Sequence, residues 1–184
     1  MKGFSIKTEI EEYDTFEQYA AQAGLGPEDL VLCGEHTYDK YVAPLSLGTQ
    51  TLFREKYGKG EPTDGMVDAI LDALHEKEFN RIIAIGGGTV VDIAKVVAVA
   101  GKEDKVDDLY DHVDSLKKVH PLVIIPTTCG TGSEVTNISV INRVSKGVKM
   151  GLASNGMLAD KAVMITDMLD SLPYKIFATS SIDA

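Results

Sequence analysis

Cysteine and histidine are scarce in this sequence, which limits the covalent and metal chemistry that it can support. The chain of 184 residues has two cysteines, Cys33 and Cys129, and four histidines. Two cysteines make neither a disulfide framework nor a metal site on their own. The histidines show no paired spacing such as i, i+4, whereas stable transition-metal sites usually draw three or four protein ligands. A disulfide scaffold is therefore excluded, and the histidines do not indicate a metal centre.

Long apolar runs and an export signal are also missing. No apolar run reaches the roughly 18 residues that a membrane span needs, and the best candidate, 82–100, is interrupted by Asp92 and Lys95. The first residues, MKGFSIKTEIEE, lack the apolar core of a secretory signal. We therefore expect a cytoplasmic protein without a membrane partner.

Positive charge is in deficit. The chain has 18 Lys and Arg against 28 Asp and Glu, a formal net charge of −10 at pH 7. Such a surface repels phosphate from most directions, so no nucleic-acid partner is expected. With 44% hydrophobic and 25% charged residues, the composition is that of an ordinary globular protein, and the length suits one domain of typical size.

Strand-like apolar segments alternate with helix-like segments along the chain. Strands are predicted over 3–10, 30–33, 81–85, 122–125 and 162–166, a hairpin over 138–144 and 148–153, and helices over 15–23, from Thr63, over 89–100 and after Leu172. The first strand is predicted because Phe4, Ile6, Thr8 and Ile10 fall on one face at a period of two. Strands separated by single helices predict an α/β fold, an open and mostly parallel sheet with helices on both faces.

The strongest local feature is a run of three glycines, Gly86, Gly87 and Gly88, between a buried strand and a helix. Glycine lets backbone N–H groups approach a ligand closely, and a helix N-terminus offers unpaired N–H groups that favour a phosphate. Thr89 adds a hydroxyl donor. The spacing departs from the dinucleotide fingerprint, because Val91 stands at its third glycine, and no Gly-Lys-Ser/Thr follows as in a P-loop. A tight turn without a ligand is the alternative.

A second polar loop, residues 126–134, follows another apolar strand. It carries four hydroxyl side chains and two glycines, which suit hydrogen bonding to a ribose or a pyrophosphate. Ligands of open parallel sheets bind just beyond the carboxyl ends of the strands, so two such loops predict a nucleotide site. Cys129 has no histidine nearby in the sequence and is interpreted as a small packing residue.

These motifs resemble those of the iron-containing (group III) alcohol dehydrogenases. The resemblance rests on residues 86–95 (GGGTVVDIAK), 126–134 (PTTCGTGSE), 172–173 (LP) and 181–184 (SIDA), in the same order and with consistent spacing over the whole chain. Within that family the sequence is most similar to the 4-hydroxybutyrate dehydrogenases, on the evidence of residues 60–64, 126–137 and 172–175.

The resemblance implies a Rossmann-like, dehydroquinate synthase-like N-terminal domain that binds NAD(P). The cofactor-binding residues that it implies are Gly86, Gly87, Gly88, Thr89 and Asp92 around the glycine loop, Thr127, Thr128, Thr131 and Thr136 around the second loop, and Lys149. NAD is the expected cofactor, and NADP is the alternative. Gly34 stands where many relatives place an Asp that accepts the adenosine ribose hydroxyls, and Glu35 follows it.

The resemblance also implies an all-helical, metal-binding second domain. We expect residues 1–172 to form the NAD(P)-binding domain and residues 173–184 to be the first helix of a truncated second domain, with Asp183 as the first metal ligand. In such enzymes Fe²⁺ or Zn²⁺ acts as a Lewis acid on the alcohol oxygen. Without the histidine ligands and the rest of the helical domain, this chain alone is expected neither to hold the metal stably nor to turn over substrate.

The implied activity is hydride transfer between NAD(P) and a small alcohol or aldehyde. The expected substrate pair is 4-hydroxybutyrate and succinate semialdehyde, and the full-length enzyme is expected to be a homo-oligomer. Arg143 and Lys149 are the nearby basic candidates for the substrate carboxylate. Two alternatives stay open: a dehydrogenase of the same family for another small primary alcohol or diol, and a non-catalytic, truncated nucleotide-binding module.

Overall fold

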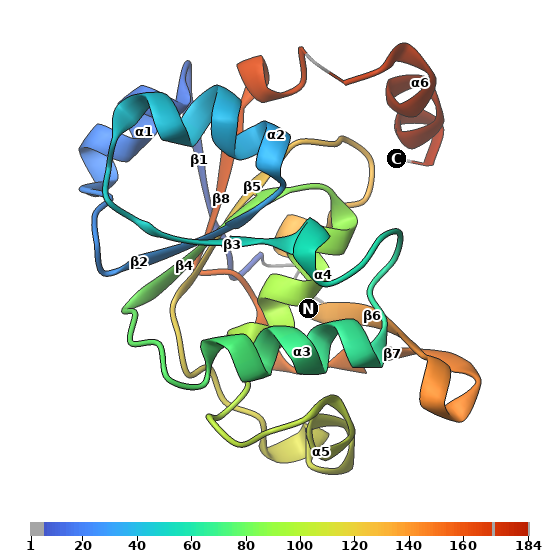
Figure 1. Cartoon of the computed structure of the whole chain (residues 1–184). Helices are drawn as coiled ribbons and strands as arrows, with labels where there is room; N and C mark the ends of the chain where they lie inside the picture. The colour runs from blue at the N-terminus through green and yellow to red at the C-terminus, as the bar shows by residue number, and fades with distance from the viewer. Residues whose placement is uncertain (1–5, 171, 184) are drawn as a thin grey trace, which may run out of the picture.

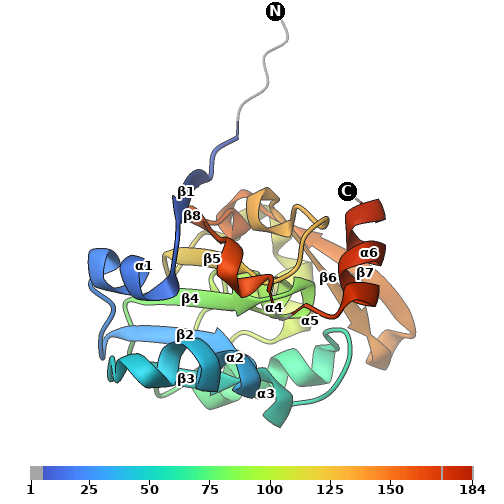
Figure 2. The same cartoon turned by 90° about the horizontal axis from the view of Figure 1, so that it is seen from above.

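The computed structural model describes residues 6–170 and 172–183 and has one main sheet of six strands. The strand order is β1-β8-β5-β4-β2-β3, and every neighbouring pair is parallel (Figure 2). The strands are β1 (Glu9–Tyr13), β2 (Asp29–Cys33), β3 (Gln50–Phe53), β4 (Arg81–Gly86), β5 (Leu122–Pro126) and β8 (Lys161–Ile165). A separate antiparallel hairpin is formed by β6 (Ile138–Arg143) and β7 (Val148–Ala153). The predicted α/β fold, parallel sheet and hairpin are confirmed.

Helices cover both faces of the sheet (Figure 1). The helices α1 (Phe16–Ala23) and α2 (Glu35–Thr37) lie on one side, and α3 (Asp64–Leu74), α4 (Gly88–Val97) and α5 (Val106–Asp111) lie on the other. The last helix, α6 (Tyr174–Asp183), lies beyond the carboxyl ends of the strands. Shorter helical turns occur at Tyr38–Val42, Ala43–Leu45, Arg54–Lys56, Val113–Ser115, Ser133–Val135, Val144–Lys146, Asn155–Met157 and Thr166–Met168. None of the helices in the described part of the chain is both long and apolar enough to cross a membrane.

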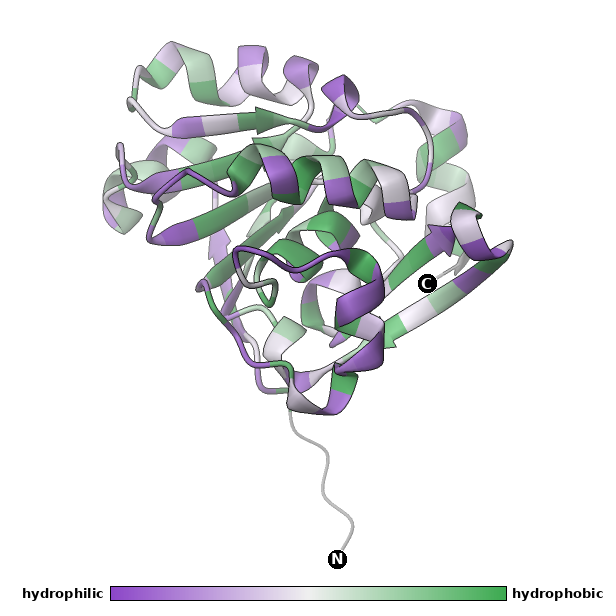
Figure 3. Cartoon of the chain, turned by 60° about the horizontal axis from the view of Figure 1, so that its bottom comes forward, coloured by the Kyte–Doolittle hydropathy of each residue, from purple (hydrophilic) through white to green (hydrophobic). Residues whose placement is uncertain are grey.

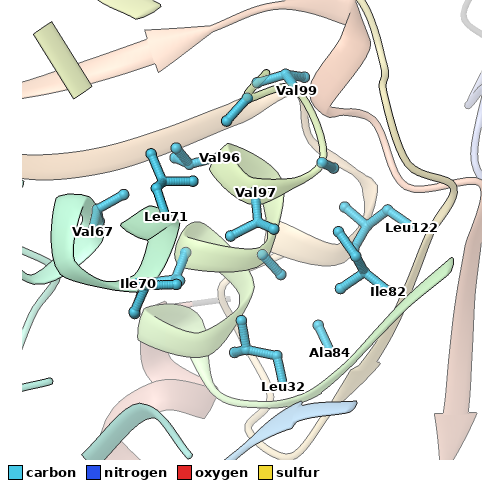
Figure 4. Packing of buried hydrophobic residues seen from close by; sticks show 14 of the residues in the cluster. Leu32, Val67, Ile70, Leu71, Ile82, Ala84, Val96, Val97, Val99 and Leu122 are labelled. Carbon is cyan, nitrogen blue, oxygen red and sulfur yellow. The ribbon is translucent and has the colours of Figure 1, made fainter. Parts of the chain in front are cut away.

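Two hydrophobic cores lie on opposite faces of the sheet. Successive side chains of a strand point to opposite faces, so the odd and even positions of each central strand enter different cores. Leu32, Ile82, Ala84 and Leu122 pack against α3 and α4 (Figure 4). Ile83 and the other buried strand residues on the opposite face of the sheet pack against α1. The central strands β4 and β5 are therefore apolar at nearly every position, as the hydropathy colouring shows (Figure 3). This double burial makes the central strands a rigid platform for the loops at their carboxyl ends.

The first strand differs from its prediction. The strand β1 covers Glu9–Tyr13 instead of 3–10, and Phe4 lies outside the described residues. Ile6 and Ile10 are 48% and 53% exposed, whereas Thr8 is buried, so these positions do not form one buried face. The strand lies at the edge of the sheet beside β8. At an edge, a period of two tells which residues share a face but not whether another element covers that face.

Candidate functional site

The strand order reverses between β2 and β4. From β2 the chain moves outward to β3, returns to the other side of β2 as β4, and continues to β5 and β8. Ligands of open α/β sheets bind at such a reversal, beyond the carboxyl ends of the strands. Cys33 pairs with Ile85 in the register of β2 and β4, so Gly34 and Gly86 follow side by side at this point.

The glycine loop lies directly beside the second polar loop. Thr127 donates its backbone N–H to the Gly86 carbonyl at 3.1 Å. A Cβ at Gly87 would lie 3.2 Å from both Oγ1 and Cγ2 of Thr128, and a Cβ at Gly86 would lie 2.6 Å from Cγ2 of Val90. Gly86 is therefore required by the packing of α4 against β4, whereas a side chain at Gly87 would need Thr128 to move by a few tenths of an ångström.

The N-terminus of α4 offers free backbone donors. Gly87 is the N-cap residue, and within the described residues no side chain caps this helix end. The space around Gly88, where a side chain would lie, is open. The first N–H groups of a helix have no partner inside it and carry a partial positive charge. The open, uncapped helix end fits the pyrophosphate of NAD(P).

The predicted threonines differ in their surroundings. Thr127 and Thr128 lie against the glycine loop, as described above. The hydroxyl of Thr89 donates to the Gly60 carbonyl at 3.3 Å, which ties α4 to the loop before α3. Thr131 is exposed, and its hydroxyl accepts the Ser133 N–H at 3.3 Å within its own loop.

Asp92 and Thr136 are held by the hairpin and by Lys95, a residue that the sequence-based prediction left out. Lys95 is fully buried in α4 and donates to Thr136 Oγ1 at 3.1 Å and to the Ile138 carbonyl at 2.8 Å. Asp92 Oδ2 accepts the Val140 N–H at 3.3 Å. Burial raises the pKa of Asp92 and, against the attraction of Asp92, lowers the pKa of Lys95 to about 8. These contacts fasten the glycine-loop helix to the hairpin.

Replacing Lys95 by Met is expected to remove a pH-dependent contribution to stability. The pKa of Lys95 falls from 10.5 to about 8 on folding, so between these values the unfolded chain binds more protons than the folded one. This lysine therefore makes the free energy of unfolding rise with pH in that window. The free energy of unfolding of wild type minus that of Lys95→Met should therefore increase from pH 8 to pH 10, by at most about 1.4 kcal/mol per pH unit.

Urea unfolding at several pH values measures this difference. Lys102→Met is the control, because pairing of the exposed Lys102 with Glu78 raises the pKa of that lysine. For Lys102→Met, the difference from wild type in the free energy of unfolding should not rise between pH 8 and pH 10. A constant difference for Lys95→Met would contradict the prediction.

The two basic side chains in the strands of the hairpin, Arg143 and Lys149, both have acidic partners. Lys149 forms an ion pair with Glu61, and both side chains are about half exposed. Arg143 is 5% exposed, pairs with Asp107, and lies 4.3 Å from the centre of the Tyr110 ring. Arg143 therefore fastens the hairpin to α5 and is too buried to bind a substrate carboxylate, whereas Lys149 stays accessible.

The last turn of α6 packs on the loop that follows β5. Gly130 has a φ of +95°, and a Cβ there would overlap the Ser180 carbonyl oxygen. Cys129 Sγ lies 3.3 Å from the hydroxyls of Ser180 and Ser181, and these hydrogen bonds lower the pKa of the thiol. The helix that ends at Asp183 is thereby brought to the second polar loop.

The described residues contain no cluster of potential metal ligands. Within residues 6–170 and 172–182 there is no group of three or more His, Cys, Asp or Glu placed to hold a metal ion. The side chains described in this structure therefore do not supply the three or four protein ligands that a stable transition-metal site draws.

Comparison with known proteins decides the family. Residues 8–166 match the profile of the family described as iron-containing alcohol dehydrogenase. The chain belongs to this family. Over its 184 residues, this iron-containing alcohol dehydrogenase chain is 40% identical to the 4-hydroxybutyrate dehydrogenase of Clostridium kluyveri, covering 100% of this chain and 49% of that protein.

Solved structures of the family share the fold. An iron-containing alcohol dehydrogenase from Thermotoga maritima matches with a TM-score of 0.79 and 26% identity, covering 98% of this chain and 52% of that one. The sulfoacetaldehyde reductase from Bifidobacterium kashiwanohense, a structure in complex with NAD⁺, matches with a TM-score of 0.82 and 23% identity, covering 100% and 51%. This iron-containing alcohol dehydrogenase chain therefore spans about half the length of these relatives and corresponds to their N-terminal α/β portion.

Proposed function

We propose that this chain is the cofactor-binding part of a metal-dependent alcohol dehydrogenase that uses NAD to interconvert 4-hydroxybutyrate and succinate semialdehyde. The observation that carries the proposal is the uncapped N-terminus of α4 beside Gly87 and Thr128, at the reversal of the strand order. The substrate assignment is supported by the 40% identity to the Clostridium kluyveri enzyme over the whole chain. In this proposal residues 1–172 bind the cofactor, and residues 173–184 begin the metal-binding domain.

The residues of this chain position the cofactor. The backbone N–H groups of Gly88 and Thr89 would bind the pyrophosphate, and Gly87 would keep the approach free. Thr127 and Thr128 would line the ribose side. NAD, when bound, supplies the hydride acceptor at its nicotinamide ring. Asp92, Thr136 and the buried Lys95 hold α4 and the hairpin in the arrangement that presents these donors.

The proposed metal centre needs ligands in addition to Asp183, because one carboxylate falls short of three or four protein ligands. The contact between Cys129 and the serines of α6 places this helix beside the proposed cofactor loop. A metal held from α6 would therefore lie on the same side of the domain as NAD. We expect the 184-residue chain by itself to show no turnover of 4-hydroxybutyrate.

Calorimetric titration of the chain with NAD and with NADP, each with and without Fe²⁺ or Zn²⁺, tests the proposal. We expect NAD to bind one site per chain with the same affinity in the presence and absence of metal. The absence of binding of either cofactor would overturn the assignment of the glycine loop. Metal-dependent turnover of 4-hydroxybutyrate by the same sample would overturn the expected inactivity.

Replacing Glu61 by Gln is expected to strengthen NAD binding about threefold, the scale of an exposed ion pair. The Gly60 carbonyl accepts the Thr89 hydroxyl, which holds Gly60 at the N-terminus of α4. Because Glu61 follows Gly60, the ion pair between Glu61 and Lys149 lies beside the same helix end. Lys149 must leave Glu61 before it can pair with a cofactor phosphate. Lys149→Met should weaken binding by a similar factor.

The double variant Glu61→Gln with Lys149→Met provides the control. Titrations at low and moderate salt should show that the gain from Glu61→Gln disappears when Lys149 is absent. A gain that persists in the double variant would contradict competition for Lys149.

A further inference from the structure

The carboxylate of Glu55 fills the space beside Gly34 at the carboxyl end of β2. A Cβ at Gly34 would lie 2.5 Å from Glu55 Oε1 and 3.5 Å from Glu55 Cδ. Glu55 belongs to the helical turn that follows β3, and β3 pairs with β2 so that Phe53 lies opposite Cys33. A carboxylate delivered by β3 therefore stands where a side chain from the end of β2 would otherwise lie.

This position adjoins the glycine loop. On the other side of β2, Cys33 pairs with Ile85, so Gly34 and Gly86 leave the sheet as neighbours at the reversal of the strand order. The Glu55 side chain is 42% exposed, and Arg54 Nη2 lies 3.9 Å from its Oε1. At 3.9 Å, and with the carboxylate open to solvent, this pair is weak, so the carboxylate is free to accept hydrogen bonds from a ligand.

We propose that Glu55 accepts the adenosine ribose hydroxyls of NAD and thereby selects NAD over NADP. This proposal rests on the proposed function, because it requires the pyrophosphate at the N-terminus of α4. In doubly wound domains a carboxylate beyond a neighbouring strand accepts the ribose 2′-hydroxyl. Here β2 is followed by Gly34, and the carboxylate is that of Glu55 in the turn after β3.

Two other carboxylates follow β2, and neither fills this space. Glu35 is the exposed first residue of α2, and Asp39 is exposed in the turn Tyr38–Val42. The three atoms nearest to a Cβ at Gly34 all belong to Glu55. The geometry therefore favours Glu55 over both residues that follow the strand directly.

An ionised carboxylate discriminates between the two cofactors by hydrogen bonding and by charge. It accepts charge-assisted hydrogen bonds from the ribose hydroxyls of NAD. The 2′-phosphate of NADP removes one hydroxyl donor and adds negative charge at the same place, which the carboxylate repels. A glutamine at this position keeps the size of the side chain and a neutral acceptor oxygen, but it loses the charge that strengthens the hydrogen bonds to NAD and repels the 2′-phosphate.

Calorimetric titrations of the 184-residue chain with three probes test the assignment: NAD, NADP, and NAD with a 2′-deoxyadenosine. We expect the wild-type chain to prefer NAD over NADP at least about tenfold, and Glu55→Gln to weaken NAD binding about tenfold while weakening NADP binding less. Removal of the 2′-hydroxyl should weaken binding to the wild type more than binding to Glu55→Gln, because only the wild type loses a charge-assisted hydrogen bond. A merely structural role of Glu55 would not produce this difference. Glu35→Gln and Asp39→Asn are matched controls that should keep the wild-type ratio.

The outcomes separate this proposal from the proposed function. An unchanged NAD-to-NADP ratio in Glu55→Gln, or a ratio changed by Glu35→Gln instead, would overturn the role of Glu55 alone. Failure of the wild type to bind either cofactor would overturn the proposed function and this proposal together. Glu55→Asp, which retains the charge, should retain the preference against NADP and serves as the second variant if Glu55→Gln unfolds.

Discussion

Replacing Gly87 by Val should weaken NAD binding about 100-fold or more, a loss of about 2.7 kcal/mol of binding free energy. Gly87 has a φ of −82° and a ψ of −173°, which a valine can adopt, so the backbone itself need not change. The added side chain would begin 3.2 Å from Thr128 and would extend between the two loops. It would therefore block the approach of a pyrophosphate to the first N–H groups of α4.

Calorimetric titration with NAD measures this loss, and Gly65→Val is the matched control. Gly65 lies in α3, and a Cβ there meets no atom within 4 Å. The control variant should bind NAD as the wild type does. If Gly87→Val bound NAD within threefold of wild type while remaining folded, the cofactor would have to bind elsewhere on the domain.

Replacing Ile124 by Ala should lower the free energy of unfolding by about 2–5 kcal/mol. Ile124 is fully buried in β5, between β4 and β8, and belongs to the core under α3 and α4. Its truncation removes apolar contacts in a place where the two neighbouring strands prevent collapse into the cavity.

Urea unfolding followed by far-ultraviolet circular dichroism gives the change in the free energy of unfolding. Ile10→Ala is the control of the same chemistry, because Ile10 is 53% exposed on the edge strand β1. That variant should lose less than about 1 kcal/mol. Equal losses in the two variants would show that the core of the folded chain is not where the structure places it.

The central strands were predictable because burial on both faces demands apolar side chains at every position. Residues 82–85 and 122–125 meet this demand, and the predicted runs 81–85 and 122–125 coincide with β4 and β5. The strand β3 escaped prediction, because only Leu52 of its four residues is buried and a short edge strand needs few apolar side chains. The edge strand β1 was predicted in the wrong place for a related reason: its pattern does not reveal which face is covered.

The glycine loop and the second polar loop could also be recognised from local sequence. Each follows an apolar strand, and parallel strands place such loops at one edge of the sheet. Their mutual distance was not predictable in detail, since the contact of Gly87 with Thr128 depends on the register of β4 with β5.

The sequence by itself determined the helices and central strands, the family resemblance and the two loops with phosphate-binding potential. Each of these can be recognised from short segments, in which the informative residues lie a few positions apart. The partners of the charged side chains were decided only in the folded chain. Lys95 reaches Thr136 on the loop before β6, Lys149 reaches Glu61, and Glu55 covers Gly34 from the turn after β3. Such pairs join segments distant in sequence, and only the packing of α4, the hairpin and β3 around the end of β2 brings them within bonding distance.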